Sequence, residues 1–246
     1  RFQRVGKIPE KYPSVLNYAK EIVARSKLVR LLRKGAGPRN LVVLDSGTVL
    51  VIGARGIFRS TDGGRSFSLV YDLAEGGYHS PMRSSVAVTL DDEVYFGEYV
   101  AGDSDRPISI MRGSNDGVDW QVAHTFEAGM IRHVHSVQYD PYRDRLWICT
   151  GDSSSESRLL YTADRFETVN VLGSGSQDWR IVSLVVTPEH LVWGSDNDTA
   201  EGASIFRWDF AADDLEELQY IGKPGYFSTS LADGTLLITT AYEVEC

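Results

Sequence analysis

Short apolar runs recur along this chain, each bounded by turns rich in glycine, aspartate and serine. Four of these runs resemble one another and are 53, 49 and 46 positions apart, measured between the central residues Phe58, Met111, Leu160 and Phe206. Two strand-like runs precede each of them and another follows, such as Phe67–Tyr71 or Trp120–Phe126. The preceding pairs are Leu41–Leu44 with Val49–Ile52, Val86–Leu90 with Val94–Phe96, Ser136–Tyr139 with Leu146–Cys149, and Ile181–Val186 with Leu191–Trp193. Four strands repeated at this period indicate the blades of a β-propeller.

A fifth unit begins near the C-terminus but has only two strands, Tyr226–Leu231 and Thr235–Thr239. The runs Phe2–Ile8 and Lys27–Leu32 can supply its two outer strands. The favoured fold is therefore an all-β propeller of five four-stranded blades, in which the N- and C-terminal strands share one blade. The alternative is a fragment of a six- or seven-bladed ring. We expect a single domain over 1–246, with N-terminal strands and a short helix (Tyr12–Arg25) in 1–38, four blades in 39–224 and the start of the fifth in 225–246.

Composition narrows the classes of partner. With 246 residues and 42% apolar content, the chain can bury a full core. Acidic residues number 34 against 25 lysines and arginines, and the net charge of -9 argues against a nucleic-acid partner. No apolar run approaches the roughly 20 residues that span a bilayer, so no membrane span is expected. The two cysteines, Cys149 and Cys246, indicate no disulfide framework, and the compartment stays open.

Arginines recur at equivalent positions of the repeat. In a propeller, the inner strand of each blade starts on the face where the second and third strands are joined, so residues at both places converge around the channel mouth. Counting back 14 residues from Gly97 and from Gly194, which end equivalent second strands, reaches Arg83 and Arg180. The residues that lead the other units are Arg132, Arg39 and Tyr226. Several guanidinium groups are therefore expected at one mouth.

Acidic residues follow the second strands, at Glu98, Asp152 and Asp196. Each arginine thus has a candidate carboxylate partner on the same face. One interpretation is a set of ion pairs that hold the blades in register. The other is recognition of a carboxylate- or sulfate-bearing ligand, because a guanidinium offers planar, bidentate donors.

Two histidines, His133 and His135, open the third inner strand, and the period of two places them on the same side of the blade. With His79, just before Arg83, three histidines fall near the predicted mouth, where imidazole can act as a general acid or base. His-x-His spacing is common by chance, and the sequence identifies no cysteine or carboxylate ligand beside it. We therefore predict no metal and no other cofactor.

Trp179 directly precedes Arg180, and we expect its ring at the mouth, where it can stack on a sugar. The other tryptophans fall within or beside predicted strands and are expected in the core. The loop Asp196–Gly202 is rich in oxygen ligands but lacks the spacing of an EF-hand, and we interpret it as a polar loop.

The segment Ser60–Phe67 reads Ser-x-Asp-x-Gly-x-x-aromatic between two strand-like runs. In such a hairpin the Asp62 carboxylate accepts hydrogen bonds from turn amides, Gly63 and Gly64 take positive φ, and Phe67 anchors the returning strand in the core. Together with the blade period, this segment resembles the Asp-box, or BNR-repeat, propellers, which include sialidases, other glycoside hydrolases, polysaccharide lyases and non-catalytic assembly factors. The resemblance covers roughly residues 40 to 240. The Phe/Tyr-Arg-Ile-Pro segment of sialidases is absent.

Three functional hypotheses follow from the residues and the resemblance. The first is a module that binds a glycan or another anionic ligand through Arg39, His79, Arg83, Arg132, Trp179 and Arg180. The second is a carbohydrate-active enzyme on acidic sugars. It is either a hydrolase using two carboxylates among Glu98, Asp152 and Asp196, or a lyase in which His133 or His135 abstracts a proton, Tyr226 assists and arginine neutralises the uronate. The third is a protein-interaction scaffold.

Overall fold

The computed structural model describes residues 40–53, 56–101 and 105–241. Within them the chain forms four four-stranded antiparallel sheets and one two-stranded sheet. Blade 1 contains β1 (Asn40–Val43), β2 (Val49–Gly53), β3 (Gly56–Ser60) and β4 (Ser68–Asp72). Blade 2 contains β5 (Val86–Val88), β6 (Val94–Gly97), β7 (Ile108–Ser114) and β8 (Asp119–Phe126). Blade 3 contains β9 (His133–Asp140), β10 (Arg145–Gly151), β11 (Arg158–Thr162) and β12 (Asn170–Ser174). Blade 4 contains β13 (Ile181–Val186), β14 (His190–Ser195), β15 (Ser204–Asp209) and β16 (Asp214–Tyr220), and the two-stranded sheet contains β17 (Gly225–Ser230) and β18 (Leu236–Thr240).

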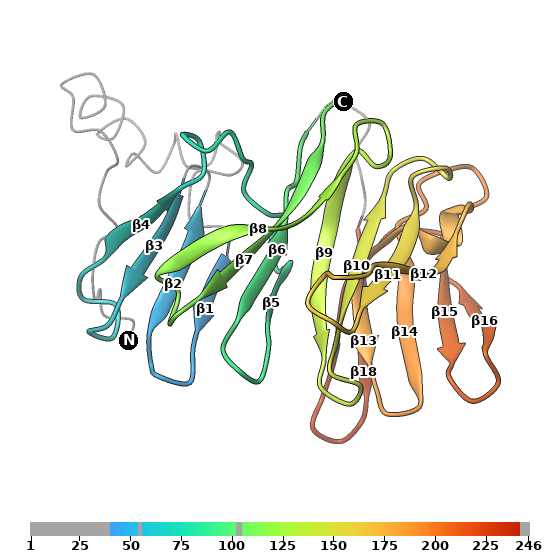
Figure 1. Cartoon of the computed structure of the whole chain (residues 1–246). Coiled ribbons are helices and arrows are strands. Elements are labelled where there is room, and N and C mark those ends of the chain that lie inside the picture. The colour runs from blue at the N-terminus through green and yellow to red at the C-terminus, as the bar shows by residue number, and fades with distance from the viewer. Residues whose placement is uncertain (1–39, 54–55, 102–104, 242–246) are drawn as a thin grey trace, which may run out of the picture.

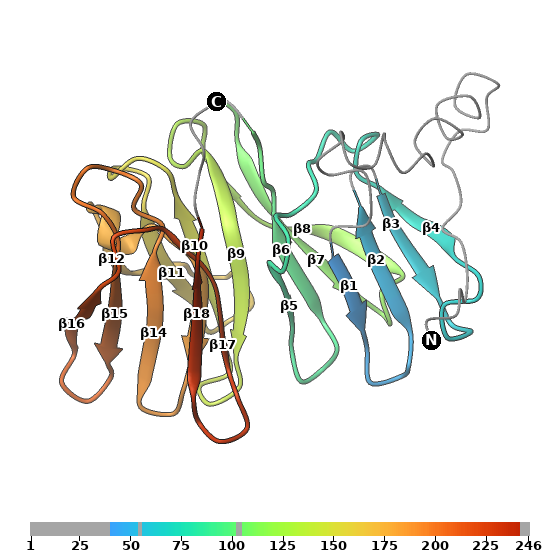
Figure 2. The ribbon, with the colours of Figure 1, turned by 180° about the vertical axis from the view of Figure 1, so that it is seen from behind.

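The strand order in each blade is the order along the chain, and the first strands of successive sheets lie side by side. Figures 1 and 2 show the sheets following one another, with the hairpins that join first and second strands all at the lower edge. The start of β9 pairs with the end of β10, because His133 faces Gly151 in the register. The starts of inner strands and the loops after second strands therefore share the upper edge of Figure 1, which we call the mouth face. The predicted all-β propeller of four-stranded blades is confirmed.

Apolar side chains between neighbouring sheets form the core. Each of three buried clusters draws residues from two adjacent blades, as when Leu50 of β2 packs with Phe96 and Met111 of blade 2. This arrangement follows from the sequence, because strands of the second and third positions are apolar on both faces and must be covered on both. Burial between blades is thus what aligns one sheet with the next.

Close backbone approach also joins the blades. Gly97 at the end of β6 has no side chain, and a Cβ there would lie 2.3 Å from the Cβ of Val134 in β9. The amide of Val134 donates to the carbonyl of Glu98 at 2.9 Å. A glycine at this position therefore lets β6 reach the inner strand that carries His133.

The β3–β4 turn forms the contacts expected of Asp62. Its Oδ1 accepts hydrogen bonds from the amides of Arg65 and Ser66 at 2.9 Å, and its Oδ2 accepts one from the Ser66 hydroxyl at 2.6 Å. Hydrogen bonds from Ser66 and Ser60 hold the pKa of Asp62 well below its usual range. Gly63 and Gly64 have φ of 68° and 82°. Phe67 is only partly buried, which corrects the expectation that it anchors β4 in the core.

The third repeat reproduces the same turn. Asp164 accepts from the Thr162 hydroxyl at 2.8 Å, the Thr168 amide at 2.9 Å and the Thr168 hydroxyl at 2.6 Å. In the second repeat Asn115 stands at the aspartate position, and the next residue, Asp116, binds Thr48 and Arg59 of blade 1. A hydroxyl on each side of the aspartate thus suffices for the turn, even where the glycines are missing.

Several predicted elements lie outside the described residues: the strands Phe2–Ile8 and Lys27–Leu32, the helix Tyr12–Arg25, and Arg39. Closure of the fifth blade by the N-terminal strands therefore stays a prediction, as does the number of blades. Among the described residues, the structure holds no helix long and apolar enough to cross a membrane.

Candidate functional site

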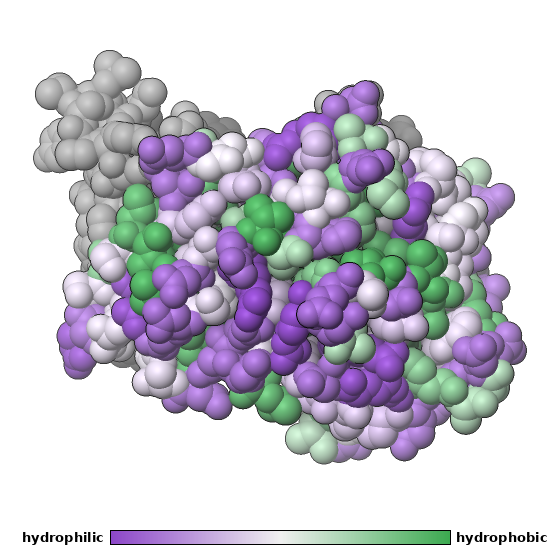
Figure 3. Space-filling view, in the orientation of Figure 1, coloured by the Kyte–Doolittle hydropathy of each residue, from purple (hydrophilic) through white to green (hydrophobic). Residues whose placement is uncertain are grey.

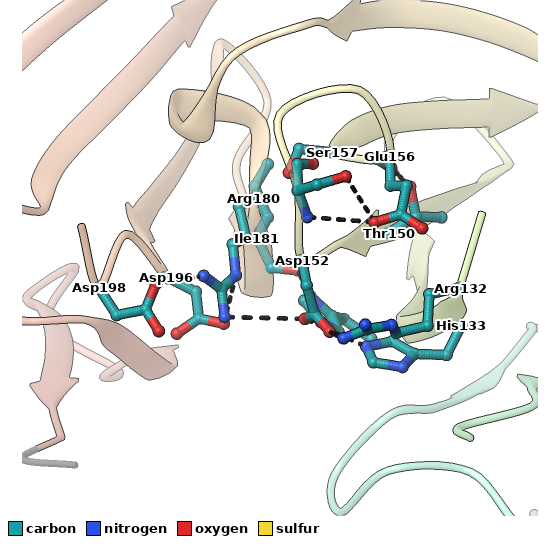
Figure 4. A network of polar contacts seen from close by, with 12 residues as sticks. Arg132, His133, Thr150, Asp152, Glu156, Ser157, Arg180, Ile181, Asp196 and Asp198 are labelled. Carbon is teal, nitrogen blue, oxygen red and sulfur yellow. Dashed lines mark hydrogen bonds and ion pairs between the residues drawn. The ribbon is translucent and has the colours of Figure 1, made fainter. Parts of the chain in front are cut away.

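The candidate site lies on the mouth face, where three chain segments meet. Arg132 and His133 stand at the start of β9, Asp152 directly follows β10, and Arg180 directly precedes β13. The inner strands β9 and β13 are neighbours, so the loop after β10 places Asp152 between them. Figure 4 shows Asp152 with Arg132 and His133 on one side and Arg180 on the other.

Asp152 is the centre of the cluster. Its Oδ2 accepts a hydrogen bond from Nη1 of Arg132 at 2.7 Å. Its Oδ1 lies 3.4 Å from Nε2 of His133, 3.4 Å from Nε2 of His135 and 3.7 Å from Nη2 of Arg180. Burial alone would raise the pKa of Asp152, but the two histidines and Arg132 hold it well below its usual range. Asp152 is therefore a carboxylate, with 27% of its side chain exposed.

The two histidines lie behind Asp152, and each is only 2% exposed. Nδ1 of His133 lies 2.8 Å from the carbonyl oxygen of Val100, and Nδ1 of His135 lies 3.0 Å from that of Ile181. Because a carbonyl can only accept, each Nδ1 carries the proton in both rings. Burial lowers the pKa of His135, although Asp152 opposes the shift, and this favours the neutral ring.

The histidine rings are further held by packing. Their centroids are 4.9 Å apart, and the ring of Tyr99 lies 4.3 Å from that of His133. The alternation of side chains along β9 places both rings on one side, as the sequence predicted, while Val134 between them faces the core.

Arg180 connects Asp152 with two more carboxylates. Its Nε lies 3.1 Å from Oδ2 of Asp196, and its Nη1 lies 2.6 Å from Oδ1 of Asp198. Burial works to lower the pKa of Arg180, but the aspartates raise it, so the guanidinium stays charged. In this cluster, the guanidinium groups of Arg132 and Arg180 face three carboxylates, and the cluster is acidic overall when the histidines are neutral.

Other predicted site residues lie apart from Asp152. Glu98 is fully buried, and its carboxylate accepts hydrogen bonds from the amides of His79 and Ser109 and from Arg106. These contacts fasten the loop after β6, so the structure places Glu98 in an internal ion pair. The side chain of His79 is exposed, as is Arg83, which makes no ion pair with the described residues. Tyr226 is the second residue of β17, where it is half-buried beside Phe227.

The expectation for Trp179 needs correction. Its side chain is only 8% exposed and packs against Trp193 and Trp208, with ring centroids 5.5 Å and 6.1 Å away. A Cβ on Gly173 would lie 2.2 Å from the indole, so the ring fills the space that this glycine leaves. The short 3-10 helix η1 (Gln177–Trp179) turns the residue inward. Trp179 therefore belongs to the core of blades 3 and 4 rather than to a sugar platform.

Sequence reasoning missed three parts of this site. Asp198 belongs to the oxygen-rich loop Asp196–Gly202, and the composition of that loop is the sequence signal for it. The carbonyls of Val100 and Ile181, which orient the histidines, have no sequence signal because every residue offers a carbonyl. Tyr99 follows the predicted Glu98, but nothing in the local pattern indicates that its ring reaches His133.

An apolar pocket lies on the side wall rather than at the mouth. It has a volume of about 250 Å³ and is lined by residues of β8, β11, β12 and nearby loops, namely His124, Phe126, Met130, Ile131, Arg158, Leu160, Val169 and Val171. Figure 3 shows this side of the molecule as a mixture of hydrophilic and hydrophobic side chains. The pocket offers one arginine and no carboxylate, so it suits a charged sugar less well than the mouth does.

The structural neighbours of the chain are β-propeller proteins. An ancestral GH74 enzyme has a TM-score of 0.64 at 12% identity, covering 85% of this chain and 30% of that one. A gluconolactonase from Xanthomonas campestris has a TM-score of 0.56 at 17% identity, covering 82% and 68%. An oligogalacturonate lyase in complex with manganese has a TM-score of 0.55 at 13% identity, covering 82% and 58%. No family model and no curated protein matches the sequence. These similarities establish the fold.

Proposed function

We propose that the protein is a propeller of the Asp-box type that binds an acidic carbohydrate on its mouth face, around Arg132 and Asp152. The observation that carries the proposal is the pairing of Arg132 with Asp152, because 30% of the arginine side chain is exposed while one of its nitrogens is anchored. An anchored guanidinium keeps its plane oriented, which reduces the entropy lost when it engages a carboxylate. The carbohydrate-related names among the fold neighbours agree with a sugar ligand.

The charge of the cluster shapes the expected ligand. Two guanidinium groups already face Asp152, Asp196 and Asp198, so a ligand carboxylate has to compete with these aspartates. A single free carboxylate gains little in such a competition. We therefore favour an oligosaccharide of several uronate or sialate residues, whose hydroxyl groups add hydrogen bonds along the mouth face.

The arrangement of the side chains in the cluster favours binding over catalysis. Asp152 and Arg132 stand in front of the histidines, which have almost no exposed surface and so cannot reach a substrate proton directly. The depressed pKa of Asp152 suits a permanent carboxylate and not the general acid of a glycoside hydrolase. These two features support a binding module.

Calorimetric titration with an oligogalacturonate, a sialylated trisaccharide and a neutral cello-oligosaccharide tests the proposal. We expect the acidic sugars to bind and the neutral one not to. Arg132→Ala removes a charge-assisted hydrogen bond of about 1.5–3 kcal/mol, so it should weaken binding about 10- to 100-fold. Arg207→Ala is the matched control, because Arg207 pairs with Glu216 on outer strands of blade 4.

Three outcomes contradict the proposal. Equal binding of neutral and acidic sugars would exclude recognition of the carboxylate. Unchanged binding in Arg132→Ala would place the ligand elsewhere. Release of shortened or unsaturated sugars from the wild type would replace the binding module with the enzyme hypothesis.

A further inference from the structure

Two imidazole nitrogens and one carboxylate oxygen meet beside the mouth. Nε2 of His133, Nε2 of His135 and a carboxylate oxygen of Asp152 all lie within 4.8 Å of one another. Nε2 of His133 is buried and has no hydrogen-bond partner within the described chain. A buried polar atom without a partner costs free energy, so this arrangement favours a proton or a metal ion between the three atoms.

The tautomers of the two histidines determine which ring nitrogens lack a proton. Both Nδ1 atoms donate to backbone carbonyls, of Val100 and Ile181, so in the neutral rings both Nε2 atoms present lone pairs toward Asp152. Two such lone pairs and a carboxylate repel one another unless a proton or a metal ion lies between them. Arg180 approaches Oδ1 of Asp152 only to 3.7 Å, and its Nε and Nη1 lie closer to Asp196 and Asp198.

The distances suit a coordinated ion. Oδ1 of Asp152 lies 3.4 Å from each Nε2. Bonds of about 2.1 Å to a tetrahedral ion place neighbouring ligand atoms about 3.4 Å apart. The outer contacts also fit, because ligating histidines commonly donate their other N–H to a backbone carbonyl, and ligating carboxylates are themselves hydrogen-bonded. Arg132 supplies that hydrogen bond to Oδ2 and leaves Oδ1 turned toward the histidines.

We propose that His133, His135 and Asp152 bind a divalent first-row transition-metal ion such as Zn²⁺ or Mn²⁺. Two imidazole nitrogens and one carboxylate oxygen favour such ions over Ca²⁺ and Mg²⁺, which prefer oxygen ligands. The partial exposure of Asp152 leaves the outward side of the ion open to solvent. The bound ion offsets the negative charge of the cluster. A sugar carboxylate bound as in the proposed function can coordinate the ion, but metal binding itself does not require the sugar.

The test uses untagged protein, stripped with a chelator and titrated with the metal alone. We expect Zn²⁺ and Mn²⁺ to bind with one ion per chain, and Ca²⁺ and Mg²⁺ to bind at least 100-fold more weakly. His133→Gln and Asp152→Asn should each weaken Zn²⁺ binding at least 100-fold. His190→Ala is the control, because His190 pairs with Asp209 on blade 4 and belongs to no metal cluster among the described residues.

A measurement on the wild type tests the proposal even if the variants fail to fold. Nitrogen NMR of the histidine rings should show Zn²⁺ shifting the Nε2 signals of two histidines, while their Nδ1 atoms stay protonated. Absence of saturable Zn²⁺ and Mn²⁺ binding overturns the proposal, as does binding that survives in His133→Gln and Asp152→Asn. The proposal is also overturned if both rings are doubly protonated and their signals do not change with Zn²⁺, because a proton then takes the place assigned to the metal ion. The metal titration contains no sugar, so a negative result does not contradict the proposed carbohydrate binding, which the sugar titration tests separately.

Discussion

Gln138 of β9 joins blades 3 and 4 by a pair of hydrogen bonds to one residue. Its Nε2 donates to the carbonyl of Leu184 in β13 at 2.8 Å, and its Oε1 accepts from the amide of Leu184 at 2.7 Å. The side-chain amide thereby satisfies both backbone groups of Leu184 at the edge of its sheet, where β13 has no pairing strand among the described residues. This bridge also sets the spacing between the strands that begin at His133 and just after Arg180.

Gln138→Met keeps the length of the side chain and removes both hydrogen bonds. Each bond contributes about 1 kcal/mol net, and each unsatisfied buried backbone group costs about 1–3 kcal/mol. Leu184 is only 3% exposed, but Gln138 is half-buried, so water recovers part of the loss. We expect the free energy of unfolding to fall by about 2–4 kcal/mol, which lowers Tm by roughly 5–12 °C in a chain of this size.

Urea unfolding followed by tryptophan fluorescence measures the change. Gln219→Met is the matched control, because Gln219 is exposed and, within the described part of the chain, its amide bonds only the carbonyl of the next residue, Tyr220. A control effect within about 0.5 kcal/mol of wild type is expected. The reasoning is refuted if Gln138→Met is no more destabilising than Gln219→Met.

Two further variants test the blade contact and the turn. Gly97→Ala places a Cβ 2.3 Å from Val134, and overpacking should lower the free energy of unfolding by about 1–3 kcal/mol; unchanged urea stability would disprove the contact. Asp62→Asn should destabilise the protein at neutral pH, because the folded pKa of Asp62 lies below its ordinary value of 3.8 and its stabilisation is present above about pH 4 and lost as the pH falls. The difference in urea midpoint between wild type and Asp62→Asn should therefore narrow below about pH 4, and a constant difference would count against the turn contacts.

Much of the fold was predictable because its causes are local. The four-strand repeat follows from apolar runs of strand length and the turns between them, and the Asp62 turn follows from side chains within five positions of one another. The side of β9 that carries His133 and His135 follows from the period of two. Such features depend on neighbouring dihedral angles and short-range hydrogen bonds, which a sequence displays directly.

The site was only partly predictable. Topology brought Arg132, Asp152 and Arg180 to one face, as the repeat indicated. Trp179 shows the limit, since it precedes Arg180 in sequence but turns into the core through η1 and the space beside Gly173. The direction of a side chain at a strand end depends on the packing of the adjacent blade, which the local pattern does not contain.

The sequence by itself determined the strand repeat, the turn chemistry and the face on which charged residues gather, because these arise from alternation and spacing along one chain segment. Only the tertiary structure decided that Asp152 meets both histidines and that Arg180 is held by Asp196 and Asp198. Within blades 3 and 4, those contacts join the start of an inner strand to the loop after the second strand, and their distances depend on how each loop folds back over the strand ends.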